Sequence, residues 1–296
     1  HGILTITNNA RFKCIVLGRA QDGGVPHFGC NKLCCTNARE NGHREFPACL
    51  GIHDTETDSL LLIEATPAIE PQVAMLQKLS GLQSKQPILD GILITHAHTG
   101  HYVGLAQLGK EVASTKSIPT YVSKQMASFL NANAPWSQLV QDKNIKLCPF
   151  DLSSTFSPVD GLQVTPVEVP HRKDWTDTVA FKITGPNQTV LFVPDIDSWK
   201  GNEELIEYLL QDVDVAYIDA TFYDGNELPN VNLETIPHPF MVDSMETLQT
   251  VAKEKSIEIR FIHLNHTNPA LWDTDIQSQI EERGFHIAKQ GEMITL

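Results

Sequence analysis

"LITHAHTGHYVGLAQLG" spans residues 93–109 and contains three histidines, His96, His98 and His101, within six positions. The apolar run ILDGILIT (88–95) that leads into it is typical of a buried strand. Residues i and i+2 at the end of a strand lie on one side of the chain, roughly 6.5–7 Å apart. Two of the imidazoles can therefore converge on one ion, and the third, after a turn, can point to a neighbouring position. Neutral imidazole is the commonest metal-ligating side chain near neutral pH. The segment predicts a metal site; surface or core histidines are the alternative.

Three more residues of metal-ligating type stand where apolar strands end. His171 closes VTPVEVPH, Asp195 closes TVLFVPD, and His263 follows EIRFI. Each of them alone would be read as a surface residue. Their recurrence at strand ends, together with the histidine-rich segment, predicts that they gather at one edge of a sheet.

Strands alternate with helices along the whole chain, and the pattern predicts an α/β protein. The segments 12–150 and 151–296 resemble each other, since each begins with strands and continues with strand–helix alternation. Helices outside two face-packed sheets satisfy this pattern. We expect one domain over residues 1–296 with these two similar halves. We also expect a helix over HYVGLAQLGKEV (101–112), whose apolar residues recur every three or four positions.

The stretch THAHTGHYVG (95–104) resembles the H-x-H-x-D-H motif of the metallo-β-lactamase-fold hydrolases. The later strand-end residues match that superfamily's later ligands in order and strand context. The resemblance implies a four-layer αββα sandwich with two mixed sheets and helices outside. It also implies two active-site Zn²⁺ ions, the first held by His96, His98 and His171, the second by His101 and His263, with Asp195 bridging them.

Gly100 departs from this motif, because it stands where the superfamily usually has an aspartate ligand. The second site then lacks one carboxylate. We expect it to bind its metal more weakly, or to exchange zinc for Mn²⁺ or Fe²⁺ more readily.

Three further stretches resemble the pyrroloquinoline-quinone synthesis protein B family and its phosphodiesterase relatives, including the cyclic phosphodiesterase of phosphonate breakdown. They are VLGRAQDGGVPHFGCNKLCCTNAR (16–39), DATFYDGNELP (219–229) and HLNHTNPAL (263–271). The quinone-synthesis proteins proper tend to have degraded metal motifs. This chain retains nearly all of the ligands, so it resembles a neighbour of that family.

The relatives carry a structural zinc on a C-x-C-x-x-C loop, with a histidine three residues after the last active-site histidine. By that resemblance, Cys30, Cys34, Cys35 and His266 form one further, structural Zn²⁺ site, with Lys32 in place of the middle cysteine. Structural zinc favours four closed ligands of these types. Three reduced cysteines and a surface histidine are the alternative.

IDATF (218–222) and IPHPF (236–240) resemble an acid–histidine pair of the transfer-RNA 3′-processing enzymes of this superfamily. The resemblance implies that Asp219 orients His238, which acts as general acid toward the leaving oxygen. A plain loop histidine is the alternative. Asp22 is a further candidate for lining the site.

The composition and net charge of the chain limit the classes of partner that it is expected to bind. The chain has 296 residues and a formal net charge of −14, from 36 Asp and Glu against 22 Lys and Arg. That charge opposes the binding of long nucleic acids. It does not exclude a small-molecule substrate. No stretch approaches the roughly 20 apolar residues of a membrane span. We expect no membrane partner and a cytoplasmic location, with the periplasm, secretion and a homodimer left open.

These observations support one function ahead of its alternatives. We expect a hydrolase with a dinuclear site that uses metal-bound hydroxide oriented by Asp195, and most of all a phosphodiesterase acting on a small substrate. The alternatives are an iron-dependent oxygenase of the quinone-synthesis type, a lactone or ester hydrolase, and a non-catalytic binding protein.

Overall fold

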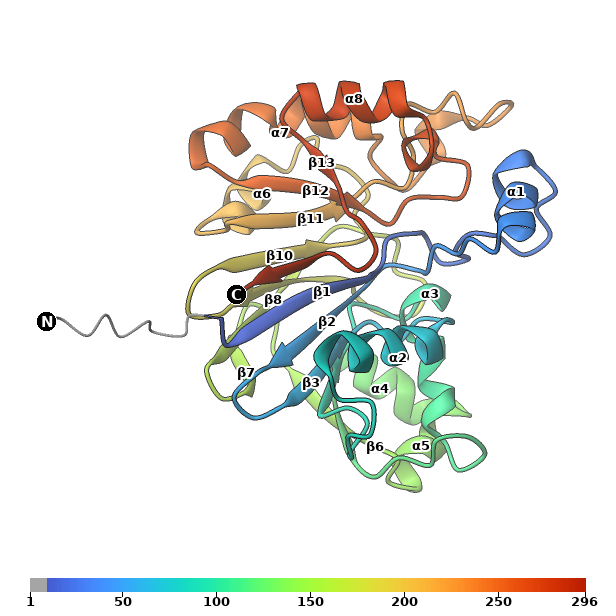
Figure 1. Cartoon of the computed structure of the whole chain (residues 1–296). Helices are drawn as coiled ribbons and strands as arrows, with labels where there is room; N and C mark the ends of the chain where they lie inside the picture. The colour runs from blue at the N-terminus through green and yellow to red at the C-terminus, as the bar shows by residue number, and fades with distance from the viewer. Residues whose placement is uncertain (1–9) are drawn as a thin grey trace, which may run out of the picture.

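Fourteen strands form two seven-stranded sheets in the computed structural model, which describes residues 10–296 (Figure 1). Residues 1–9 of the expected domain range lie outside the described residues. The first sheet is antiparallel from β14 to β3 and parallel from β3 to β6. Its strands, in spatial order, are β14 (Met293–Thr295), β1 (Phe12–Gly18), β2 (Cys49–Asp54), β3 (Ser59–Ile63), β4 (Gly91–Leu93), β5 (Ile118–Ser123) and β6 (Ile145–Phe150).

The second sheet repeats this mixed pattern. It is antiparallel from β7 to β10 and parallel from β10 to β13. Its strands, in spatial order, are β13 (His286–Ile287), β12 (Glu258–Ile262), β11 (Val215–Asp219), β10 (Thr189–Val193), β9 (Val179–Thr184), β8 (Leu162–Glu168) and β7 (Phe156–Val159).

Helices cover the outer face of each sheet, so that the four layers run helix, sheet, sheet, helix. Figure 1 shows α7 and α8 above the second sheet and α2, α4 and α5 below the first. The predicted αββα sandwich is confirmed. The helices are α1 (Leu33–Asn41), α2 (Ile69–Ser80), α3 (Thr99–Tyr102), η1 (Val103–Leu108), α4 (Lys124–Ala132), α5 (Trp136–Gln141), α6 (Glu203–Leu210), η2 (Leu233–Thr235), α7 (Met241–Lys255), η3 (Pro269–Leu271) and α8 (Thr274–Glu282).

Strand β3 shows how alternating side chains build three apolar layers. Leu61 and Ile63 point to the layer between the sheets, and Leu60 and Leu62 point to the layer under the helices. This alternation follows from the two-residue repeat of a strand. A third apolar cluster fills the space between the second sheet and α6, α7 and α8.

The expected helix over 101–112 is wrong in type and length. The chain forms one turn of α-helix, α3, and then the 3₁₀-helix η1. Gly104 explains the change, because its N–H donates to the carbonyl of Ala65 at 2.9 Å. A Cβ at Gly104 would lie 2.2 Å from the carbonyl oxygen of Thr66. The backbone is therefore drawn against the end of β3 instead of continuing as a regular helix.

Candidate metal centre

The predicted site residues lie at one edge of the sandwich, where strands of common direction end. β3 and β4 are parallel in the first sheet, and β10, β11 and β12 are parallel in the second. Loops after such strand ends are where α/β sheets bind ligands. The contributions are His96 and His98 after β4, His101 in α3, His171 after β8, Asp195 after β10, and His263 after β12.

Asp195 lies among the histidines. Its Oδ2 is 2.8 Å from Nε2 of His101, and 3.5 and 3.4 Å from Nε2 of His96 and His263. Its Oδ1 is 3.7 Å from Nε2 of His171. All five side chains are buried. One carboxylate thus reaches histidines of both expected metal sites, which is what a bridging ligand must do.

Two of the groups of potential ligands correspond to the two expected metal sites. The ligand atoms of His96, His98 and His171 lie within 4.8 Å of one another. A second group of the same closeness contains His101 and His263 together with Asp22. The structure therefore brings the five histidines together in the same groups that the sequence analysis expected.

Two buried nitrogen atoms show that the donor set fits a metal ion. Nε2 of His96 and Nε2 of His101 are buried and have no hydrogen-bond partner within residues 10–296. For His101 this holds although Asp195 Oδ2 is 2.8 Å away, so the two groups are close but not aligned for a hydrogen bond. Leaving a buried polar atom unsatisfied costs about 1–3 kcal/mol. A cation that accepts both lone pairs would remove that cost.

The second nitrogen of each imidazole meets an outer partner. Such partners fix the ring orientation and determine which nitrogen faces a metal. The five contacts are Thr95 Oγ1 to His96 Nδ1 (2.9 Å), Asp174 Oδ2 to His98 Nε2 (3.0 Å), Glu64 Oε2 to His101 Nδ1, Asp197 Oδ1 to His171 Nδ1 (3.1 Å) and Thr221 Oγ1 to His263 Nδ1 (2.9 Å).

Burial keeps three of these histidines uncharged. Burial holds the pKa of His96 well below its ordinary value, and the neighbouring His101 adds to the effect. Burial also lowers the pKa of His98 and outweighs Asp195 to lower that of His171. A neutral imidazole is the form that binds metals, so these side chains are ready to bind at neutral pH.

The carboxylate among them stays charged. Burial alone would raise the pKa of Asp195, but His263 and His101 outweigh it and hold that pKa well below its ordinary value. A permanent negative charge at this position favours a cation between the two histidine groups.

Glu64, at the end of β3, is a site residue that the sequence analysis missed. Its side chain is fully buried, and its backbone has a φ of 82°, a region that non-glycine residues rarely adopt. It accepts hydrogen bonds from the backbone N–H and the hydroxyl of Thr95, both at 2.8 Å, and from Nδ1 of His101. A carboxylate at the end of the apolar run SLLLIEA was the available signal, as it was for Asp195.

Asp219 and His238 meet as the sequence predicted. Nδ1 of His238 donates to Asp219 Oδ2 at 2.7 Å, and Thr221 donates to Asp219 Oδ1 at 2.8 Å. Burial opposes a charge on His238, but Asp219 outweighs it and raises the pKa of His238 to about 9. Nδ1 of His238 is also 3.5 Å from Asp195 Oδ1. A cationic proton donor therefore adjoins the histidine cluster.

A cavity of about 490 Å³ opens beside His238. Its volume falls in the range of small-molecule sites. Its lining includes the aromatic side chains of Trp199 and Phe240 and the charged side chains of Lys200 and Asp243. It is suited to a small polar substrate next to the histidine cluster.

The Beta-lactamase superfamily domain matches residues 60–264, which is more than half of the chain. The chain belongs to the beta-lactamase superfamily. The resemblance drawn from the sequence is confirmed.

Other members of the superfamily are similar along almost the whole chain. Coenzyme PQQ synthesis protein B of Methylobacterium sp. (strain 4-46) is 24% identical over 309 residues, which cover 96% of this chain and all of the relative. The protein of the same name from Rhizobium meliloti (strain 1021) is 22% identical over 307 residues, with 96% and 98% covered. The resemblance to this group is confirmed as well.

Solved structures of other proteins show the same fold. Zn²⁺-bound PqqB from Methylobacterium extorquens has a TM-score of 0.79 at 21% identity and covers 96% of this chain and 100% of its own. A diphosphatase from the PhnP family has a TM-score of 0.68 at 18% identity, with 96% of each chain covered. At these identities the likeness establishes the architecture only.

The predicted structural zinc site is assembled in part. Sγ of Cys30 and Sγ of Cys34 are 4.0 Å apart, and those of Cys34 and Cys35 are 3.8 Å apart. His266 is not part of this group of potential ligands, and its Nδ1 is buried without a hydrogen-bond partner among residues 10–296. Its ring stacks on that of His27, with 4.0 Å between the ring centroids. The backbone N–H of His27 donates to Cys35 Sγ at 3.2 Å, so His27 links the two.

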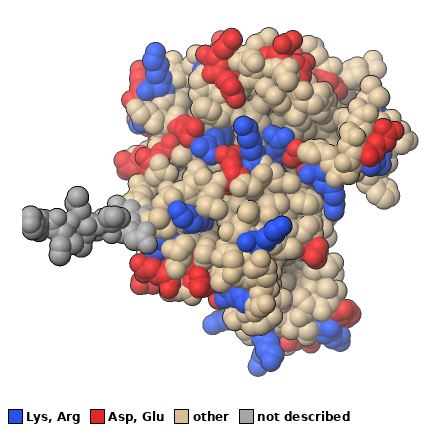
Figure 2. Space-filling model, in the orientation of Figure 1, with Lys and Arg blue, Asp and Glu red and all other residues tan. Residues whose placement is uncertain are grey.

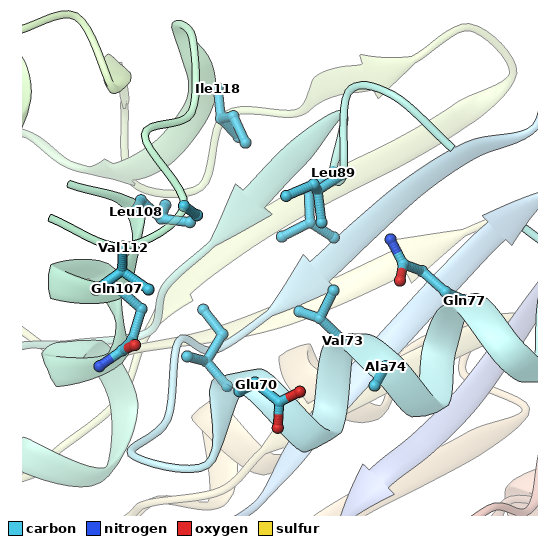
Figure 3. A pocket seen from close by; sticks show the side chains of 12 residues that line it. Glu70, Val73, Ala74, Gln77, Leu89, Gln107, Leu108, Val112 and Ile118 are labelled. Atoms are coloured by element: carbon cyan, nitrogen blue, oxygen red, sulfur yellow. The ribbon is translucent and has the colours of Figure 1, made fainter. Parts of the chain in front are cut away.

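An apolar pocket lies elsewhere, between α2 and the segment around Leu108 (Figure 3). Figure 3 shows Val73, Leu89 and Ile118 pointing into it. Glu70 is its one titratable lining residue, so this pocket offers no comparable chemistry. Among residues 10–296, no helix has the length and apolar character to span a bilayer.

Proposed function

We propose that this chain is a zinc-dependent phosphodiesterase that cleaves a small substrate. In this proposal His96, His98 and His171 hold one ion, His101 and His263 hold the other, and Asp195 bridges them. The observation that carries it is the Asp195 carboxylate, which lies 2.8–3.7 Å from Nε2 of four buried histidines. Bound ions would lower the pKa of water to about 7 and polarise the phosphoryl oxygens.

The remaining chemistry belongs to the protein's own side chains. Asp195 is charged and can accept a hydrogen bond that orients the attacking water. Asp219 holds His238 protonated at pH 7, since it raises the pKa of His238 to about 9. With Nδ1 engaged by Asp219, the proton on Nε2 is the one available to the leaving oxygen. General acid catalysis of this kind contributes typically 10²–10⁴-fold in rate.

Two basic side chains near the histidine cluster are available to pair with a small anionic substrate. Lys200 lines the cavity beside His238, together with the carboxylates of Asp197, Glu234 and Asp243. Arg172 follows His171 directly and is close enough to His98 to help lower its pKa. On the face drawn in Figure 2, acidic and basic side chains are interspersed and form no continuous basic stripe. With a net charge of −14, this supports a compact phosphodiester over a long nucleic acid.

The comparisons support zinc and phosphate chemistry without assigning them. PqqB of Methylobacterium extorquens is described as Zn²⁺-bound, and the PhnP-family relative is described as a diphosphatase. We propose one further structural zinc held by Cys30, Cys34 and Cys35, with the buried Nδ1 of His266 as the fourth ligand. Burial and the neighbouring Cys35 raise the pKa of Cys34 to about 12, and a bound cation would offset that cost.

Metal content and turnover test the proposal together. We expect purified protein to contain zinc, to lose hydrolysis of bis(p-nitrophenyl) phosphate on chelation, and to regain it with Zn²⁺ or Mn²⁺. His96→Ala should prevent the recovery of hydrolysis when metal is added back, and it should lower the metal content of the purified protein. His286→Ala is the matched control, because this exposed histidine pairs with Glu258 away from the centre. Protein that binds no metal, or hydrolyses a lactone or carboxylic ester in preference, would overturn the phosphodiesterase assignment.

One observation favours a second candidate, an iron-dependent oxygenase. The group of Asp22, His101 and His263 offers two imidazoles and a carboxylate. This set resembles the two-histidine, one-carboxylate ligation of non-haem Fe(II) oxygenases. Oxygen consumption with Fe²⁺ and a tyrosine-like substrate, absent with Zn²⁺, would favour it.

A further inference from the structure

Gly100 removes a carboxylate from the expected motif, but the structure places another carboxylate at the same location. Asp22 lies in the loop after β1, 78 residues away in sequence. Its Oδ2 accepts a hydrogen bond from the backbone N–H of Gly100 at 2.9 Å. Its Oδ1 is 3.2 Å from Nε2 of His263 and 3.4 Å from Nε2 of His101.

A side chain at position 100 and the side chain of Asp22 exclude each other. A Cβ built on Gly100 would lie 2.3 Å from Cγ of Asp22 and 2.6 Å from its Cβ. The φ of Gly100 lies outside the left-handed region, so the backbone does not demand a glycine. Glycine is needed at this position because Asp22 fills the space.

The Asp22 loop is tied to the strand end that carries His263. The N–H of Gln21 donates to the carbonyl of Leu264 at 2.8 Å, and the N–H of Leu264 donates to the carbonyl of Arg19 at 2.8 Å. The side chains of Gln21 and Asn265 are also hydrogen-bonded, at 2.5 Å. These bonds join the residues just before Asp22 to the residues just after His263, and so tie the two chain segments together.

We propose that Asp22 is the carboxylate ligand of the second metal site and replaces the side chain that Gly100 lacks. This inference rests on the proposed function only in requiring a metal at His101 and His263. It revises the expectation that the second site is weak. The site keeps a carboxylate, supplied from the opposite side by the N-terminal loop, and so keeps the charge and the ligand count of a filled motif.

Binding of Mn²⁺ tests this without reference to turnover. Mn²⁺ prefers carboxylate oxygens to thiolates, so the cysteine cluster does not contribute and the titration is sensitive to the loss of a carboxylate. We would follow the free ion by electron paramagnetic resonance during titration of the metal-free protein. We expect Asp22→Asn to weaken the second equivalent at least about 10-fold, the lower bound for loss of an outer partner, and to leave the first unchanged. Asp160→Asn, an exposed carboxylate in another loop, is the matched control.

A swap of the two positions makes the test specific. Gly100→Asp alone should weaken the second equivalent, because the new side chain collides with Asp22. Asp22→Gly together with Gly100→Asp should recover it to within about threefold of the original protein. Alanine at position 22 would not serve, since its Cβ would still lie 2.6 Å from a Cβ at position 100. Circular dichroism of each variant reports folding, and the Asp22→Asn result stands alone if Gly100→Asp fails to fold.

The outcomes separate this inference from the proposed function. If the original protein binds two equivalents and Asp22→Asn binds both equally well, the Asp22 assignment is overturned and the dinuclear site survives. If His101→Ala and His263→Ala bind as the original protein does, no second site exists and both proposals fail. Loss in Asp22→Asn with recovery in the swapped variant supports the assignment.

Discussion

Asp219 accepts a hydrogen bond from Nδ1 of His238 at 2.7 Å, with both side chains almost completely buried. If this pair is the proton donor, the cost of its loss depends on how much the leaving oxygen needs a proton. We expect His238→Ala to lower kcat for an alkyl phosphodiester by about 10²–10⁴-fold. Bis(p-nitrophenyl) phosphate should be affected far less, because p-nitrophenolate leaves readily without a proton. Asp219→Asn should act in the same direction.

Metal content is the control for this comparison. His238→Ala should retain the zinc content of the original protein, measured by elemental analysis. Equal losses on both substrates would contradict a general-acid role and would indicate that His238 binds metal or substrate instead.

Glu64 provides a test of positioning at a distance from the reacting atoms. Because it accepts from Nδ1 of His101 and from Thr95, it holds the imidazole with Nε2 toward Asp195. We expect Glu64→Gln to lower the affinity for the second metal by about 10–100-fold, as for other outer partners of ligating histidines. Equilibrium titration of metal into both proteins measures this. Glu70→Gln, on α2 beside the apolar pocket, should bind like the original protein.

The candidate ligands could be predicted because the end of a strand can be recognised in the sequence. An apolar run that stops on a histidine or aspartate marks the sheet edge, and this rule found His171, Asp195 and His263. The hydrogen-bond partners of the histidines could not be predicted. Asp174 and Asp197 lie in loops, and a loop has no repeating pattern that shows where its side chains point. The role proposed for Asp22 depends on the space left by Gly100, which only the three-dimensional structure shows.

The layers of the fold could be predicted from the sequence, but not which strands pair with each other. Apolar runs located β4, β8, β10 and β12, and repeated strand–helix alternation indicated two covered sheets. No local pattern shows that β14 pairs with β1 across almost the whole chain, with Lys13 opposite Thr295. The helix expected over 101–112 does not form, because Gly104 packs against the carbonyl groups of Ala65 and Thr66. These two residues lie outside the segment from which the helix was predicted.

We expect the zinc ion at the cysteine cluster to have no part in turnover. We expect Cys35→Ser to lose one zinc equivalent and to keep hydrolysis within about twofold, because structural zinc contributes to folding energy and not to catalysis. Elemental analysis and thermal unfolding measure the two effects. Cys148→Ser, in strand β6 away from the cluster, should change neither. Unchanged zinc content in Cys35→Ser would leave the three cysteines as reduced thiols.

We expect Asp54, at the end of β2, to make the free energy of unfolding depend on pH. Its buried carboxylate accepts from Nε and Nη2 of Arg11, both at 3.0 Å, and from Thr57 at 2.8 Å. Burial alone would raise the pKa of Asp54, but the bonds from Arg11 and Thr57 outweigh it and lower that pKa. A carboxyl with a lower pKa in the folded state stabilises the fold above its unfolded pKa of about 3.9. This contribution is lost as the pH falls through the folded pKa.

Asp54→Asn should therefore cost about 2 kcal/mol in the free energy of unfolding at pH 7, in the range for hydrogen bonds to charged groups. The difference from the original protein should shrink as the pH falls below about 4. Urea titrations at pH 7 and pH 3 measure it. The control is Asp58→Asn in the same β2–β3 turn, because Asp58 is largely exposed and its φ of 58° suits asparagine equally well. A cost for Asp54→Asn that is the same at both pH values would show that its charge does not stabilise the fold, and that the loss comes from packing alone.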